Sequence, residues 1–112
     1  MRTSLSPLQL LRPRSLRDAL RLLREERPLV PLAGCTDVYV GLNFSTLHDQ
    51  RFLNIWGLDG LGGISADGDV LRIGALATYT EIIGSPLVRR RVPMLVSAAR
   101  EVGAVQIQNR GT

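Results

Sequence analysis

The sequence predicts an α+β domain whose two halves are organised differently. In the first half, apolar segments at 8–11, 29–32 and 51–55 alternate with helical patterns, an order typical of parallel strands joined by right-handed crossovers. In the second half, a tight turn joins two short strands, and helices follow. We therefore expect a small βαβ-type subdomain over residues 1–57 and the start of a second α+β subdomain over 58–112.

The first helix of the chain is predicted to begin at Ser15. Serine at the N-cap and Asp18 three residues later form the pattern of a capping box. Apolar residues then recur at i, i+3, i+4 and i+7, which predicts one buried helix face. That face comprises Leu16, Ala19, Leu20 and Leu23. Pro28 ends the helix, because proline cannot supply a backbone N–H.

A β-hairpin is predicted at the start of the second half. Asp67-Gly68-Asp69 is a strong turn signal, and the segments 64–66 and 70–73 flank it. Thr78 and Glu81 then form a second capping box, which predicts a short helix directly after the hairpin.

A longer helix is predicted between Pro93 and Gly103. Its apolar residues repeat the spacing of a buried face, and they are Leu95, Ala98, Ala99 and Val102. Residues 105–107 are interpreted as a further strand, after which the chain closes at Gly111-Thr112. Because a domain seldom stops directly after a new strand and a turn glycine, we expect these 112 residues to be the N-terminal part of a longer domain.

The composition is that of an ordinary globular protein, with 45% hydrophobic and 21% charged residues. No apolar run is long enough to span a bilayer. The N-terminus does not resemble an export signal, because Arg12, Arg14 and Arg17 interrupt its apolar residues. Cys35 is the only cysteine and cannot form an internal disulfide. These observations favour the cytoplasm.

The net charge of +4 is the difference between fourteen arginines, with no lysine, and ten acidic residues. The arginines are spread along the chain, and the only dense cluster lies at 89–91. A nucleic-acid surface more often combines clustered basic residues with aromatic ones, which make up only 4% here. The sequence therefore favours a solvated surface, and nucleic-acid binding, suggested by the pI of about 10.5, is the weaker interpretation.

Residue types used in catalysis and metal binding are scarce. His48 is the only histidine, and we interpret it as a surface-loop residue because it lies in a polar stretch. A zinc-type site needs three or four ligands at workable spacing, and the sequence offers none. Cys35 would need a neighbouring base or positive charge to become a nucleophile. We therefore predict neither a catalytic residue nor a metal site.

The most informative segment is the turn at 33–37, which is followed by a short apolar helix predicted over 38–42. Gly34 permits backbone angles that a side chain disfavours and lets an anion approach the main chain. Successive N–H groups that lead into a helix N-terminus form a site for phosphate. Thr36 adds a hydroxyl donor, whereas Asp37 could instead cap the helix. Such turns also occur as plain N-caps, so this turn alone does not establish a function.

Three segments together carry a family resemblance. They are Leu32-Ala33-Gly34-Cys35-Thr36-Asp37, Ile73-Gly74-Ala75 with Thr78, and Gln106-Ile107-Gln108-Asn109-Arg110-Gly111-Thr112, in that order. In this combination the chain resembles the FAD-binding flavoprotein component of the molybdenum hydroxylases, the xanthine dehydrogenase and carbon monoxide dehydrogenase family. The resemblance extends over nearly the whole chain. It implies an α+β FAD-binding domain of the PCMH, or vanillyl-alcohol-oxidase, type.

In this family, two glycine-rich loops hold the diphosphate of FAD between them. The resemblance places the cofactor-binding residues at Pro31, Leu32, Ala33, Gly34, Cys35, Thr36, Asp37 and Val38, with Gly111 and Thr112 at the start of the second loop. The family's Ile-Gly-Gly-Asn continuation is absent from this sequence, so we expect the chain alone to bind FAD weakly or not at all. Cys35 stands where the family usually has glycine, and Gln108 where it usually has arginine.

The resemblance implies an oxidoreductase component that is inactive by itself. Electrons would pass from 2Fe-2S iron–sulfur clusters to FAD and on to an acceptor. The implied partners are a molybdenum-cofactor subunit and a 2Fe-2S subunit or domain in a hetero-oligomer, with no nucleic acid and no membrane. An alternative of a different class is a cofactor-free assembly module of the same fold, which would bind an acidic partner through the arginines at 89–91.

Overall fold

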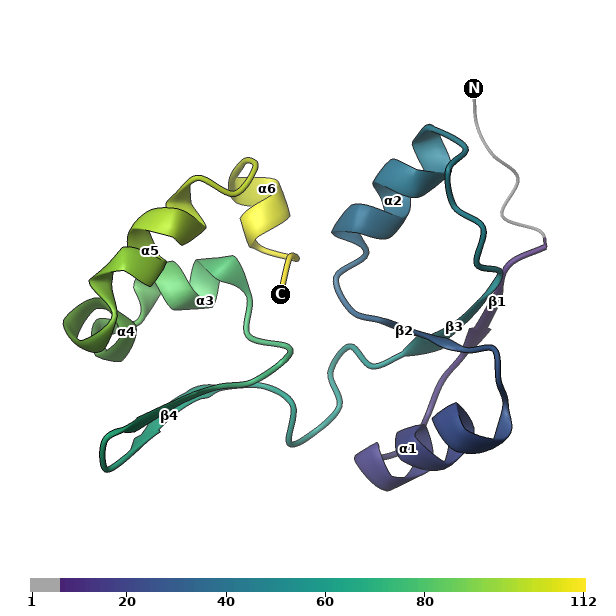
Figure 1. Cartoon of the computed structure of the whole chain (residues 1–112), viewed down its shortest axis with the longest axis horizontal. Helices are drawn as coiled ribbons and strands as arrows, with labels where there is room; N and C mark the ends of the chain where they lie inside the picture. Colours follow the sequence, from purple (N-terminus) through teal and green to yellow (C-terminus); the bar gives the residue numbers. More distant parts are fainter. Residues whose placement is uncertain (1–6) are drawn as a thin grey trace. The chain divides into compact units, whose positions relative to one another are not determined.

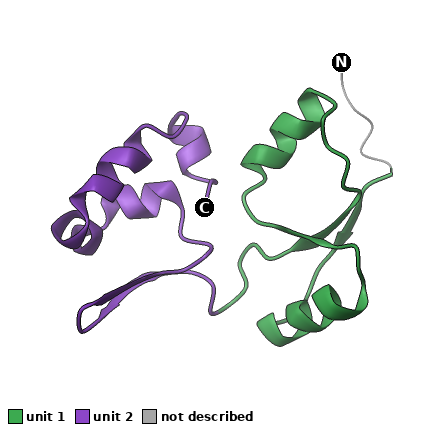
Figure 2. Cartoon of the chain, viewed as in Figure 1, with its two compact units in different colours: residues 1–59 green, residues 60–112 purple. Residues whose placement is uncertain are grey.

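The computed structural model describes residues 7–112, which divide into two compact units. The first unit ends at Asp59, and the second comprises Gly60–Thr112 (Figure 2). Each unit contains its own sheet and its own helices (Figure 1). Within residues 7–112, none of the helices combines the length and the apolar character needed to cross a membrane.

The first unit is built on a parallel sheet with a helix on each face. Its strands are β1 (Gln9–Leu11), β2 (Val30–Leu32) and β3 (Arg51–Asn54), in the spatial order β1-β3-β2, and its helices are α1 (Leu16–Glu25) and α2 (Thr36–Asn43). The chain crosses the sheet in one direction through α1 and returns through α2. Because parallel crossovers are right-handed, this reversal places the two helices on opposite faces (Figure 1). The predicted element order and parallel pairing are confirmed.

The core of the first unit is centred on β3. Phe52 and Leu53 are 4% and 0% exposed. Successive strand residues point to opposite faces of a sheet. Phe52 accordingly faces α2, where it lines a cavity together with Leu42, and Leu53 faces the side on which α1 buries Ala19.

The cap of α1 differs slightly from a capping box. The Ser15 hydroxyl accepts a hydrogen bond from Asp18 N–H at 3.0 Å, as predicted. The Asp18 carboxylate, however, accepts from the N–H of Arg14 at 3.0 Å rather than from that of Ser15. The reciprocal half of the box is therefore shifted by one residue, and it still satisfies a backbone donor that precedes the helix.

The face that α1 buries is also different from the predicted one. Leu20 is 60% exposed and Leu16 is 37% exposed, so their predicted burial is wrong. The buried face is centred on Ala19, with Leu22 and Leu23 half-buried beside it. The leucines of this helix form two overlapping stripes. Packing selects the face formed by Ala19, Leu22 and Leu23, on which the small alanine side chain lets the helix approach its neighbours closely.

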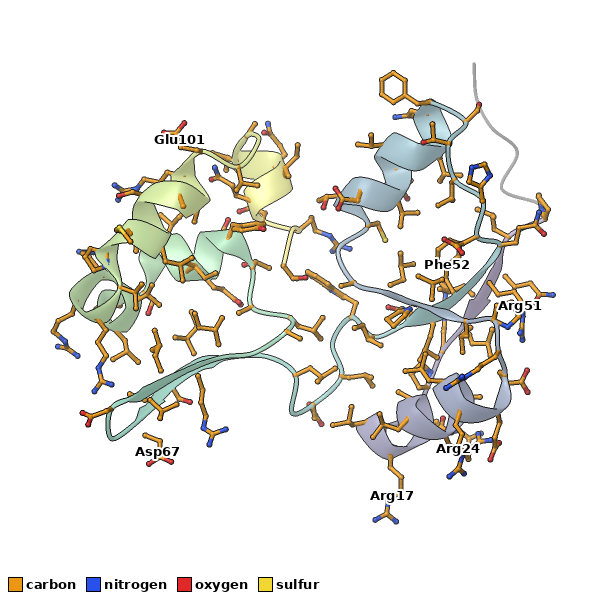
Figure 3. The ribbon with its side chains drawn as sticks, in the orientation of Figure 1. Arg17, Arg24, Arg51, Phe52, Asp67 and Glu101 are labelled. Atoms are coloured by element: carbon orange, nitrogen blue, oxygen red, sulfur yellow. The ribbon has the colours of Figure 1, made fainter. Side chains whose placement is uncertain are left out.

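A clamp that the sequence analysis did not identify ties this unit together at Arg51. Its Nη2 contacts Glu26 Oε2 at 2.9 Å, and its Nη1 donates to the backbone oxygen of Glu26 at 2.6 Å. Its Nε donates to Gln9 Oε1 at 3.1 Å. One side chain of β3 thus binds both β1 and the end of α1. By contrast, Arg17 and Arg24 extend from α1 into solvent (Figure 3).

The second unit begins with an antiparallel hairpin and continues with helices. The hairpin consists of β4 (Ile64–Asp67) and β5 (Val70–Ile73). The helices are α3 (Tyr79–Gly84), α4 (Pro86–Arg91), α5 (Pro93–Arg100) and α6 (Val105–Gln108). The predicted hairpin is confirmed, with Asp67 near its tip (Figure 3) and Gly68 at a φ of 57° in the turn. The capping box between Thr78 and Glu81 is complete.

Three predictions for the second unit are wrong, and one helix was missed. Residues 105–107 form the start of α6 instead of a strand, and α4 was not predicted at all. The helix after Pro93 ends at Arg100, before the predicted stop. It buries Val96 and Ala99, whereas the predicted core residue Ala98 is exposed. These helices are too short for periodicity to define them, so contacts between neighbouring helices decide their limits and faces.

Candidate functional site

The predicted phosphate turn lies at the carboxyl end of β2. The chain turns at residues 33–35 and enters α2 directly at Thr36. The end of β3 lies alongside, since the N–H of Ile55 donates to the backbone oxygen of Leu32 at 2.9 Å. Open parallel sheets bind their ligands at the carboxyl ends of strands. This turn therefore occupies the part of the first unit where a ligand is expected.

The left-handed residue of this turn is Cys35, not Gly34. Cys35 has φ 69° and ψ 8°, a conformation that residues with a Cβ adopt at a cost of about 1–2 kcal/mol. Gly34 is not among the described glycines with positive φ. The residue that adopts left-handed backbone angles is therefore Cys35, one position after the glycine for which they were predicted. This geometry explains why a glycine suits the position of Cys35.

The turn presents a row of unused backbone donors. No described residue accepts a hydrogen bond from the N–H groups of residues 34–38, and the first bond of the helix runs from Tyr39 N–H to Cys35 O at 3.0 Å. A left-handed residue before a helix makes consecutive N–H groups converge. Together with the helix dipole, they form a site suited to an anion.

The side chains of the turn leave these donors accessible. Asp37 is exposed, and its carboxylate accepts no hydrogen bond from a described residue, so the alternative in which it caps α2 is not formed. Thr36 is half-buried next to the N–H groups, where its hydroxyl can add a neutral donor. The donor set, all N–H and O–H groups with no lysine or arginine in the turn, fits a phosphate oxygen bound by the main chain.

The thiol of Cys35 is accommodated by the packing of the first unit. It forms part of the wall of an apolar cavity of about 260 Å³ between the sheet and α2. Its Sγ lies 3.7 Å from the backbone oxygen of Ala33. Tyr39 and Phe52 line the same cavity. The side chain that replaces the family's usual glycine therefore contributes to a wall of the unit itself.

The second predicted segment, at Gly111, is held by backbone hydrogen bonds. The N–H of Gly111 donates to the oxygen of Ile107 at 2.7 Å, and its oxygen accepts from the N–H of Tyr79 at 3.1 Å. A Cβ at this position would lie 3.1 Å from the ring of Tyr79. Gly111 is therefore closely packed against Tyr79, and its own N–H is already bonded to Ile107.

Gln108 has a role that the family resemblance did not suggest. Its side chain is 9% exposed, and its Nε2 donates to the backbone oxygens of Arg100 and Val102, both at 3.1 Å. Arg100 is the last residue of α5 and Val102 lies in the turn after it, where backbone oxygens lack partners within the helix. The residue that replaces the family's usual arginine is thus an internal cap for α5.

Asn109 and Thr80 are a pair that sequence reasoning missed. The hydroxyl of Thr80 donates to Asn109 Oδ1 at 2.6 Å, which joins the end of α6 to the first turn of α3. The only sequence signal was the presence of Asn109 in the most specific of the three family segments. Its partner is 29 positions away and could not be identified from spacing.

The remaining candidate residues carry no site. His48 is exposed in a loop, as predicted. Residues 7–112 contain no group of three or more His, Cys, Asp or Glu residues that could hold a metal ion. Arg91 donates through Nη1 to the backbone oxygen of Gly68 at 2.8 Å and so ties α4 to the hairpin. One arginine of the predicted acidic-partner surface is therefore engaged inside the unit.

Comparison with known proteins identifies relatives of this chain. Residues 6–112 match the family described as the FAD binding domain in molybdopterin dehydrogenase. The xanthine dehydrogenase FAD-binding subunit of Escherichia coli O157:H7 is 34% identical over 102 residues, which are 90% of this chain and 35% of that protein. The nicotinate dehydrogenase FAD-subunit of Eubacterium barkeri is 34% identical over 89% of this chain and 34% of that protein.

A solved structure also resembles this chain. Carbon monoxide dehydrogenase from Hydrogenophaga pseudoflava superimposes with a TM-score of 0.87 and 28% identity, covering 94% of this chain and 37% of that one. The chain thus spans little more than a third of the length of the proteins it matches. These matches confirm the predicted family resemblance and the predicted fold class.

Proposed function

Because the chain belongs to the family of FAD-binding domains in molybdopterin dehydrogenases, we propose that it is the N-terminal part of an electron-transferring flavoprotein component. FAD is the cofactor of this family. We expect electrons to reach it from 2Fe-2S clusters and to leave for an acceptor. The proposed partners are a molybdenum-cofactor subunit and a 2Fe-2S subunit or domain in a cytoplasmic hetero-oligomer.

The observation that carries the proposal is the row of N–H groups at residues 34–38, for which no described residue is an acceptor. A diphosphate oxygen placed there would accept several backbone hydrogen bonds and face the positive end of α2. The hydroxyl of Thr36 would add a further donor. We propose Pro31 and Leu32 as the edge of this site and residues 33–38 as its body.

Gly111 and Thr112 are proposed as further FAD-binding residues, at the start of the second loop of the FAD-binding domain. In this role Gly111 would act through its small size and its bonded backbone rather than through its N–H. When bound, FAD supplies the electron-carrying chemistry. The residues of this chain bind and orient it, and we assign no proton transfer to any of them.

A hybrid protein tests the proposal. In it, residues 1–112 replace the corresponding segment of the carbon monoxide dehydrogenase medium chain. The match between the two proteins covers 89% of the present chain. We expect the purified hybrid to be yellow and to retain FAD. A colourless hybrid that folds and takes up no FAD would contradict the proposed function.

The substitution Gly34→Val locates the site within the hybrid. Because the φ of Gly34 is not positive, a side chain there need not strain the backbone, but it would obstruct approach to the N–H row. We expect loss of FAD with an unchanged circular dichroism spectrum. Gly62→Ala is the control, because a Cβ at Gly62 would meet nothing within 4 Å. Equal FAD content in both variants would refute the assignment of the turn.

A further inference from the structure

The segment that leads to Thr112 is attached to α3 at two points. Thr80 Oγ1 donates to Asn109 Oδ1 at 2.6 Å. Two residues further along, the oxygen of Gly111 accepts from the N–H of Tyr79 at 3.1 Å. Both donors belong to the first turn of α3, so the segment lies across the beginning of that helix.

This attachment determines the direction of the next backbone donor. The peptide group between Gly111 and Thr112 is planar and trans, so its C=O and N–H point in opposite directions. Because the C=O is directed at Tyr79, the N–H of Thr112 is directed away from α3. Among the described residues, none accepts a hydrogen bond from this N–H.

We propose that Thr80 and Asn109 are positioning residues for the cofactor diphosphate. By holding the chain before Gly111 on α3, their hydrogen bond aims the N–H of Thr112 outward as the first donor of the second loop. This inference rests on the proposed function, and it adds two residues that make no contact with the cofactor themselves.

The exposure of Thr80 and Asn109 distinguishes a positioning role from a role in the hydrophobic core. Thr80 and Asn109 are both exposed, whereas the hydrophobic core of this unit is formed by Ile82, Val88, Val96 and Ala99. A hydrogen bond between exposed neutral groups contributes little to folding stability, because water replaces it. Its loss should therefore change the local segment more than the fold.

The first experiment uses the 112-residue chain and measures amide hydrogen exchange. Thr80→Val removes the hydroxyl with little change in shape, and Thr80→Ser retains it. In Thr80→Val we expect the amides of Tyr79 and Gly111 to exchange about fivefold faster relative to Ile82, the loss typical of one hydrogen bond. Thr80→Ser should match the unsubstituted chain. Unchanged exchange in Thr80→Val would refute the attachment.

The second experiment measures the dissociation constant for FAD in the hybrid protein. We expect Thr80→Val to weaken binding about fivefold, Thr80→Ser to restore it, and the melting temperature to stay nearly constant. Equal affinity in the three proteins would overturn the positioning role. An unsubstituted hybrid without FAD would refute the proposed function together with the cofactor part of this inference, whereas the exchange experiment would still decide whether Thr80 holds the segment.

Discussion

The turn after β2 and the segment after α6 use their backbone donors in opposite ways. In the first unit, the N–H groups of residues 34–38 have no acceptor among the described residues. In the second unit, the N–H and C=O of Gly111 are both bonded within the unit. The first turn thus presents a set of N–H donors, whereas the second segment is attached to α6 and α3 through the backbone of Gly111.

The two units also differ in how they are held together. The ion pairs of α1 and the pair between Arg51 and Glu26 lie in the first unit. The second unit relies on close packing around glycines and on buried hydrogen bonds such as those of Gln108. We therefore expect substitutions to change the stability of the second unit mainly through crowding. In the first unit, they should change stability through backbone strain and charge.

The largest effect is expected for Gly74→Ala in the second unit. A Cβ on Gly74 would lie 2.6 Å from the backbone oxygen of Gly62, and that backbone cannot move aside easily. We expect the free energy of unfolding to fall by about 3 kcal/mol in urea titrations. Gly84→Ala is the control, because a Cβ there meets nothing within 4 Å and alanine favours a helix. Similar results for both variants would contradict the crowding argument.

The next effect is expected for Gln108→Leu. The substitution keeps the apolar volume but leaves the backbone oxygens of Arg100 and Val102 without their donor. We expect destabilisation of about 2 kcal/mol, measured by urea unfolding. Gln108→Arg should lose less stability, because the arginine side chain again offers N–H donors. The exposed Gln106→Leu on the same helix should be nearly neutral, and an equal loss there would argue against an α5 cap.

A smaller effect is expected from backbone strain at Cys35. Glycine adopts the left-handed conformation freely, so Cys35→Gly should stabilise the first unit by up to about 1 kcal/mol. Cys35→Val should destabilise it by about 1 kcal/mol, since a β-branched residue tolerates positive φ poorly. Thermal unfolding measures both. Ser45→Gly, at the other described non-glycine residue with positive φ, should stabilise similarly. Stabilisation by Cys35→Val would contradict the backbone strain assigned to Cys35.

The smallest effect concerns pH and the ion pairs of α1. The hydrogen bond from Arg14 N–H, followed by that from Arg21, lowers the pKa of Asp18, and hydrogen bonds from Arg21 and then Arg24 lower the pKa of Glu25. Carboxylates with lowered pKa stabilise the fold above their ordinary pKa, and this contribution is lost as the pH falls below about 4.

Arg21→Met tests this pH dependence. We expect a slightly lower urea midpoint than in the unsubstituted chain at pH 7 and a smaller difference at pH 3. The effect should be small because these side chains are exposed and screened by solvent. Arg17→Met is the control, since Arg17 forms no ion pair with the described residues. A difference that grew at low pH would contradict the assignment.

The sequence alone determined the features that depend on neighbouring residues. The N-cap at Ser15, the capping box at Thr78 and the hairpin around Gly68 were all predicted correctly. Each is formed within a few residues of chain, so local preferences decide it. The parallel pairing of the first three strands was predicted from the alternation of strand and helix patterns along the chain.

Only the tertiary structure decided which face of a helix is buried and which residue of a turn carries the strain. Packing leaves Leu20 exposed although Ala19 is buried as predicted, places residues 105–107 in a helix, and brings Thr80 to Asn109. It also places the left-handed conformation on Cys35 rather than on Gly34. These outcomes depend on contacts between residues distant in the chain, which override local preference when a segment is only one or two turns long.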